Sequence, residues 1–294
     1  MSEPTGVIHD IGYQRYTGPR LGRWHVFGAL YGHGLRTAFG LGRSAKAKIF
    51  PWLVVGIVTV VAAGITAVRS QIGQVVWTYA QFADGMSWLV IFFVAVAAPE
   101  LVSRDLRSGV LPLYFSRPLP RGDYAIAKLL SLMTALWLLL GGPQLVMFLG
   151  AAFTTDKGMS GVWDELLDLL PGLLYAALWA VVFASIGLLI ASLTGKRAFA
   201  AGGIVAVFLM TAPIVGVLSI MPSRTVNELA FLASPSTLVG AVGTWALGDL
   251  LVPDGRVGGI PIGDFGPVYG VAAVLLVATC VTLLLLRYRK VAAR

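Results

Sequence analysis

Cysteine is almost absent from this sequence, and charged residues are scarce. A single cysteine, Cys280, among 294 residues permits no intrachain disulfide and no thiolate metal site. Only 12% of the residues are charged, whereas 57% are hydrophobic, and the mean hydropathy is +0.82. These values exclude an ordinary soluble domain and predict an all-α integral membrane protein.

Patterns typical of metal sites and of ion-coupled carriers are also missing. The three histidines, His9, His25 and His33, lie near the start of the chain at separations that match no metal motif. The charge-free apolar runs contain no ionisable side chain, although such groups usually mark proton-coupled carriers. A proton-driven transporter and a membrane metalloenzyme are therefore both disfavoured, and we expect no metal site.

The sequence lacks the Gly-x-x-x-x-Gly-Lys-Ser/Thr loop that cradles nucleotide phosphates. Gly195 and Lys196 are followed by Arg197, and Ile190 stands where the upstream glycine is required. The chain is therefore not its own ATPase by that route. We expect a transmembrane subunit that is not an enzyme, has no catalytic residue and binds no cofactor itself.

Apolar runs long enough to cross a bilayer recur along the chain, since about 20 residues of helix span the hydrocarbon core. The second run is the weakest, because Asp84 and Glu100 bracket its short uncharged centre. The sequence predicts a six-helix transmembrane domain over residues 49–294, with helices at about 49–68, 82–102, 124–153, 169–194, 198–223 and 265–286.

Basic residues are distributed unevenly between the two sides of this predicted bundle. Of the 22 Lys and Arg residues, 18 lie in the N-terminal segment, two connections and the C-terminal tail. Only Arg69, Lys157, Arg224 and Arg256 fall on the other side. The positive-inside rule therefore places both termini in the cytoplasm of a multi-pass plasma-membrane protein. The net charge of +8 reports this orientation, and nucleic-acid binding is an unnecessary interpretation.

The N-terminal part divides into two segments, and no cleavable signal peptide is expected there. Residues 1–22 are polar and turn-rich, and we expect a cytoplasmic segment. Residues 23–48 show helical spacing of apolar side chains, with Arg36, Arg43 and Lys46 on the polar side. They predict an amphipathic interfacial helix in the headgroup region, the alternative being a cytoplasmic helix packed on protein.

Two features of the apolar part bear on transport. The outer segment between the fifth and sixth helices is partly apolar and carries Trp245, which predicts a partly re-entrant course. Few polar groups interrupt the spans. Gln144, beside Pro143, and Thr211 are the candidates for a translocation path, although such groups more often join helices than bind ligands.

The most densely charged stretch runs from residue 100 to residue 129, between the second and third apolar runs. Glu100 precedes Arg104 by four residues, the order that favours a helical ion pair. Asp123 is placed to cap the third helix at its N-terminus. Taken alone, the stretch allows a simple interpretation: positive anchors at the inner face and a compact turn.

This stretch resembles the intracellular loop of type-2 ABC exporter permeases, and the predicted layout of the whole chain is similar too. Val110 departs from the pattern, because many members have Thr there. The N-terminal strings IHDIGYQRYTGPRLGR and FGLGRSAKAK resemble those of actinobacterial members. The matching residues of the stretch are Glu100, Arg104, Asp105, Arg107, Ser108, Gly109, Leu111, Pro112, Ser116, Arg117, Pro118 and Lys128.

The resemblance implies an assembly of two permease chains, identical or related, with two cytoplasmic ABC ATPase subunits that bind ATP and Mg²⁺. It implies that the loop and the interfacial helix dock onto the ATPases. The loop contacts would be Glu100, Arg104, Asp105, Arg107, Ser108, Gly109, Arg117 and Arg121.

We therefore expect the permease subunit of an ATP-driven exporter. A path lined by apolar and hydroxyl groups predicts a hydrophobic or amphipathic cargo, such as a lipid, an antibiotic or a lipid-linked glycan. Two alternatives stay open: a non-transporting scaffold or sensor coupled to an ATPase, and a passive channel, which requires a continuous polar stripe.

Overall fold

Helices form the architecture throughout the described chain. The computed structural model describes residues 18, 21–108, 120–251 and 260–291, and no strand occurs among them. The elements in chain order are α1 (Arg23–Ala38), α2 (Ala45–Ile72), α3 (Tyr79–Gly85), α4 (Ser87–Leu101), α5 (Ser103–Arg107), α7 (Arg121–Thr154), α8 (Met159–Leu193), α9 (Arg197–Leu218), α10 (Arg224–Leu229), η1 (Ala230–Ala233), α11 (Pro235–Leu251), η2 (Gly263–Phe265) and α12 (Gly266–Val291).

Five helices of the described chain are each long and apolar enough to cross a membrane: α2, α7, α8, α9 and α12. Two sharply bent pairs are further candidates. The chain bends by 56° between α3 and α4, and by 115° between η1 and α11. The structure therefore holds five to seven candidate spans. The count of six and the re-entrant course near α11 stay predictions.

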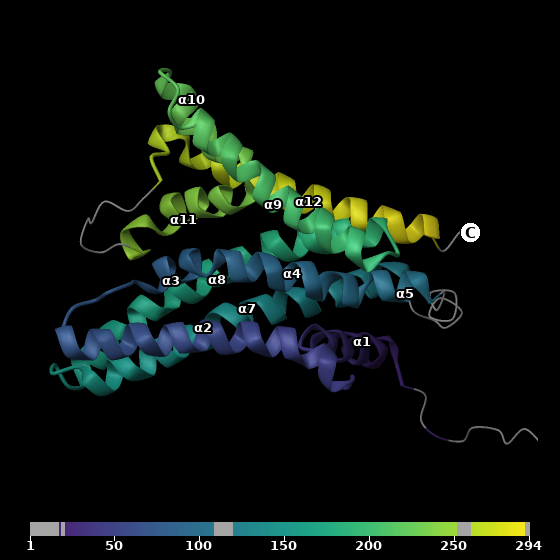
Figure 1. Ribbon diagram of the computed structural model, residues 1–294, viewed down its shortest axis with the longest axis horizontal. Helices are drawn as coiled ribbons and strands as arrows, with labels where there is room; N and C mark the ends of the chain where they lie inside the picture. Colours follow the sequence, from purple (N-terminus) through teal and green to yellow (C-terminus); the bar gives the residue numbers. More distant parts are fainter. Residues whose placement is uncertain (1–17, 19–20, 109–119, 252–259, 292–294) are drawn as a thin grey trace, which may run out of the picture.

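The centre of the bundle consists of α7 and α8. In their most apolar windows 50% and 61% of the residues are buried, against 22% in α2 and α12 and 17% in α9. Figure 1 shows α4 between α2 and α9, with α7 and α8 behind them. The outer helices therefore turn apolar side chains, such as Val60 and Met210, away from the bundle. In a membrane such faces contact lipid or another apolar chain.

The interfacial helix expected over residues 23–48 is wrong as a single helix. The chain leaves α1 at Ala38 and enters α2 at Ala45, because Gly40 and Gly42 between them have φ values of 68° and 77°. This left-handed backbone is readily adopted only by glycine and ends a helix. Arg36 therefore belongs to α1, Arg43 to the connection and Lys46 to the first turn of α2.

The bundle has two ends that differ in chemistry. Figure 1 shows α1, α5 and the C-terminal end of α12 at one end, and α3 and α10 at the other. These are called the α1 end and the α10 end below. The buried face of α1, which includes Leu30 and Gly34, packs against α7 and α4. At Gly34 an added Cβ atom would lie 2.4 Å from Oγ of Ser131, so the contact is close.

A glycine on α8 allows the close approach of α3, and its replacement tests this packing. A Cβ atom at Gly172 would lie 2.4 Å from Cβ of Tyr79, which the backbone of α3 holds in place. We expect Gly172→Ala to lower the free energy of unfolding by about 1–3 kcal/mol through overpacking. Thermal unfolding of the purified protein in detergent measures the change.

The matched control is Gly202→Ala on α9, where an added Cβ atom meets nothing within 4 Å. The control should leave the unfolding temperature nearly unchanged. Equal unfolding temperatures for the two variants would contradict the packing of α3 on α8.

Candidate functional site

Glu100 lies near the end of α4, and its carboxylate joins three elements at the α1 end. Arg43, from the connection between α1 and α2, donates a hydrogen bond to it at 2.5 Å. Arg197, the first residue of α9, donates another at 2.5 Å. The helical pair expected between Glu100 and Arg104 is not formed, because α4 ends at Leu101 and the chain turns into α5.

Asp105, on the short helix α5, anchors that helix to α7. Its carboxylate contacts the Lys128 ammonium at 2.9 Å and accepts a hydrogen bond from the Tyr124 hydroxyl at 2.6 Å. The Lys128 side chain is only 3% exposed. The Lys128 ammonium also lies 5.4 Å from the centre of the Tyr124 ring, within the range of a cation–π contact. The buried cation is therefore held by one acidic partner and one aromatic ring.

Asp123 joins α7 to α1. The Arg23 guanidinium donates two hydrogen bonds to its carboxylate, at 2.5 Å and 2.6 Å, and this contact raises the pKa of Arg23. The expectation that Asp123 caps the helix is wrong, since α7 begins at Arg121 after Pro120 and Asp123 lies within its first turn. A carboxylate there still interacts favourably with the positive end of the helix dipole.

The remaining loop residues differ from these paired acids. Arg104, Arg107 and Ser108 are exposed, and neither arginine forms an ion pair with a described residue. Ser103, by contrast, is buried, and its hydroxyl donates to the Ala191 carbonyl of α8 at 2.8 Å. The α5 helix therefore has a fixed inner side and a charged outer side. Gly109, Arg117 and the side chain of Arg121 lie outside the described residues.

The two residues predicted for a translocation path lie in different surroundings. Gln144 on α7 is fully buried, and its Nε2 atom donates to the Tyr79 carbonyl at 3.0 Å, whereas its Oε1 atom has no partner among the described residues. The Thr211 hydroxyl on α9 donates to the Val207 carbonyl at 2.8 Å and lies within hydrogen-bond distance of the Ser234 hydroxyl, at 3.1 Å. Their described contacts join helices, and neither side chain reaches the other.

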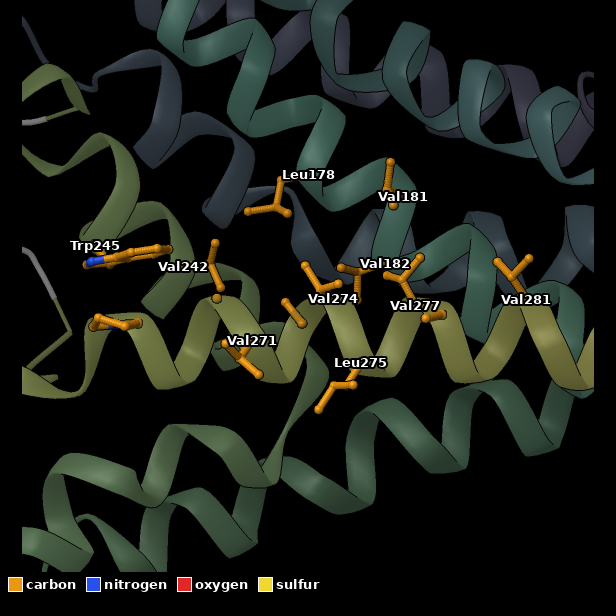
Figure 2. Close-up of a pocket in the computed structure, with 14 residues that line it drawn as sticks. Leu178, Val181, Val182, Val242, Trp245, Val271, Val274, Leu275, Val277 and Val281 are labelled. Atoms are coloured by element: carbon orange, nitrogen blue, oxygen red, sulfur yellow. The ribbon is translucent and has the colours of Figure 1, made fainter.

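An apolar groove of about 820 Å³ lies between α8, α11 and α12. Figure 2 shows Val274, Val277 and Val281 of α12 along the groove, opposite Leu178 of α8, with Trp245 near one end. No charged residue lines it. Such a surface matches a hydrocarbon chain better than a polar solute. Neither Gln144 nor Thr211 contributes to its lining.

Sequence reasoning missed a second set of polar contacts, at the α10 end. Arg69 of α2 donates two hydrogen bonds to the Glu165 carboxylate of α8, and the Tyr79 hydroxyl donates a third at 3.2 Å. The Tyr175 hydroxyl of α8 donates to Asp84 of α3 at 2.5 Å. The partners are 86 to 96 residues apart. No local pattern could have paired them, although an acid inside a weak apolar run was a signal for Asp84.

More than half of the chain matches a known protein family. Residues 60–237 match the family described as ABC-2 family transporter protein. This range runs from α2 into α11 and includes the connection that carries Glu100, Asp105 and Lys128. A comparison with curated proteins gave no match. Within the described chain, no group of three or more His, Cys, Asp or Glu residues is placed to hold a metal ion.

The ion pair between Asp105 and Lys128 can be tested by removing one partner and then both. Asp105→Asn should lower the free energy of unfolding by about 3–5 kcal/mol, because it leaves a buried ammonium without a counter-charge. The double variant Asp105→Asn/Lys128→Met removes that ammonium and should recover most of the loss. Thermal unfolding in detergent measures both variants. A double variant no more stable than the single one would contradict this account.

Proposed function

We propose that this chain serves an ATP-driven exporter. The chain belongs to the ABC-2 transporter family and is a permease subunit of an ABC transporter. ATP and Mg²⁺ would bind to two separate cytoplasmic ATPase subunits. The cargo would be hydrophobic or amphipathic, such as a lipid, an antibiotic or a lipid-linked glycan. The observation that carries the proposal is the short helix α5 at the α1 end. Its inner side contacts α7 and α8 through Asp105 and Ser103, and its outer side exposes Arg104 and Arg107.

The bracing of α5 supports a role in coupling. Asp105 ties it to α7, and Ser103 ties it to α8. Glu100, one residue before the turn into α5, is tied in addition to α9 and to the connection before α2. A partner that displaces α5 would therefore displace several membrane helices together, because these contacts are short and largely shielded from water. This is the mechanical requirement for driving a permease from the cytoplasm.

The exposed side of α5 supplies the partner contact in this proposal. Among the described residues, the exposed side chains of Arg104, Arg107 and Ser108 would contact the ATPase. Gly109, Arg117 and Arg121 extend this surface by resemblance alone. Glu100 and Asp105 support it from within, since their carboxylates are already engaged.

The orientation of the chain follows from charge. Lys and Arg residues are concentrated in the segments that belong to the α1 end, so the positive-inside rule places that end in the cytoplasm. With α1 there, its exposed residues Trp24 and Arg36 match a position at the headgroup level of the inner leaflet. We propose that α1 lies there, packed on α7 and α4.

A second permease chain completes the proposed assembly. The helices α2 and α9 turn most of their apolar surface away from the bundle. The two polar side chains predicted for a translocation path, Gln144 and Thr211, are engaged between neighbouring segments of the chain. We propose that the cargo path forms between two such chains, identical or related, with their apolar faces toward each other.

Co-purification tests the permease assignment. The tagged chain, expressed with its genomic neighbours and purified in mild detergent, should carry an ABC ATPase in stoichiometric amount and hydrolyse ATP. Mass spectrometry identifies the subunits. An oligomer free of ATPase and without ATP hydrolysis would favour a passive channel and contradict the exporter.

Charge reversal on α5 tests the contact. Arg104→Glu combined with Arg107→Glu should reduce the ATPase retained per permease at least about tenfold, because like charges then oppose each other at the contact. The permease should still insert and fold, since neither arginine forms an ion pair within the described chain. Quantitative co-purification measures the loss.

The control is Lys157→Glu, a charge reversal of an exposed residue at the α10 end. It should leave the retained ATPase unchanged. Full retention of ATPase by the Arg104→Glu/Arg107→Glu variant would refute the contact on α5.

A further inference from the structure

Asp84 differs from the other acids that hold the bundle together. Five carboxylates of the described chain each contact an Arg or Lys side chain, namely those of Glu100, Asp105, Asp123, Glu165 and Glu228. Asp84 contacts no Lys or Arg side chain of the described residues, and its hydrogen bond comes from the neutral hydroxyl of Tyr175. The carboxylate therefore carries a charge that no described cation balances.

Its position makes this exception informative. Asp84 is the second-to-last residue of α3, which ends at Gly85, and α4 begins at Ser87. Together α3 and α4 form a bent pair that is apolar enough to cross a membrane. Acidic side chains within membrane spans are rare and usually functional, because their charge is costly there without a partner. Asp84 is nevertheless exposed on the surface of the single chain. It is therefore accessible to a ligand.

Aromatic side chains lie near this end of α3. The Trp77 ring lies against Gly85, so that an added Cβ atom there would meet it at 2.7 Å. Tyr175 lies edge-on against the ring of Trp179, which is buried and whose indole N–H has no hydrogen-bond partner among the described atoms. Aromatic faces beside a carboxylate attract an organic cation through both charge and cation–π contacts.

Exposed apolar side chains follow Asp84 in the chain, along α4. Trp88, Phe92 and Val96 follow one another at intervals of one helical turn, and they are 56%, 42% and 37% exposed. From Trp88 to Val96 the helix rises by about 12 Å. A molecule with a cationic group at Asp84 could therefore lay an apolar body of this length along the helix.

We propose that Asp84 and its aromatic surroundings form a binding site for a monovalent organic cation with an apolar body. A divalent metal fits less well, because Mg²⁺ and Ca²⁺ require about six oxygen ligands and the site offers one carboxylate. The site defines the cargo class of the exporter, so this inference rests on the proposed function. It narrows the hydrophobic or amphipathic cargo to positively charged amphiphiles.

Two ions of similar size and opposite charge test the site. Tetraphenylphosphonium should bind the purified permease in nanodiscs at least about tenfold more tightly than it binds Asp84→Asn, a difference that one favourable charge contact supplies. Tetraphenylborate should bind the variant as well as the natural chain, or more tightly. Equilibrium dialysis measures both affinities.

Two control variants separate charge from structure. Asp84→Glu keeps the carboxylate and should keep tetraphenylphosphonium binding within about threefold, and Asp164→Asn removes an exposed acid elsewhere at the α10 end and should change nothing. Equal binding of tetraphenylphosphonium by the natural chain and Asp84→Asn would overturn the site. A parallel loss of both ions would also overturn it, because it would show a structural role alone.

This assay requires no ATPase, so its outcome is separate from that of the co-purification. A stoichiometric ATPase together with unchanged cation binding by Asp84→Asn would leave the exporter standing and remove the cation site.

Discussion

The buried ammonium of Lys128 constrains the arrangement of the α1 end. Inside a membrane protein, water is not available to solvate a charge, so the helix that carries it must bring a counter-charge within contact distance. Asp105 supplies it at 2.9 Å, and this fixes α5 against α7. Because α5 directly follows α4, the same contact determines where α4 ends and where Glu100 points.

The other acids of this end extend the same constraint. Glu100 brings the start of α9 and the connection before α2 to the end of α4, and Asp123 brings α1 to the start of α7. Each contact joins segments that are far apart in the chain. The result is a rigid end whose free charges, Arg104 and Arg107, lie on its outer surface. In the proposed coupling, these contacts would carry a movement of α5 into the membrane helices.

The two ends of the bundle treat charge differently. At the α10 end, Arg69 and Glu165 form an ion pair, whereas Asp84 accepts a hydrogen bond from the neutral Tyr175 hydroxyl and contacts no Lys or Arg side chain among the described residues. Asp84 therefore differs from the five carboxylates that contact an Arg or Lys side chain within the described chain. The proposed cation site rests on this difference.

Composition and apolar run length by themselves determined that this is an all-helical membrane protein, because the cost of exposing polar backbone to hydrocarbon leaves few alternatives. The residues after Glu100 also revealed the transporter family before any coordinates. Helix boundaries near glycine were less predictable: the left-handed backbone at Gly40 and Gly42 divided the expected helix over residues 23–48, and no amphipathic pattern signals such a break.

Only the tertiary structure decided which charges are engaged and which are free. Glu100 and Arg104 match a helical pair by spacing, yet Glu100 contacts Arg43 and Arg197, which lie 57 and 97 residues away. In the sequence Asp84 lies at the edge of an apolar run, and only the packing of α3 on α8 shows that its hydrogen bond comes from Tyr175 and that no described cation contacts it. The reason is physical: hydropathy depends on neighbours along the chain, whereas the partner of a charge depends on which helices meet in space.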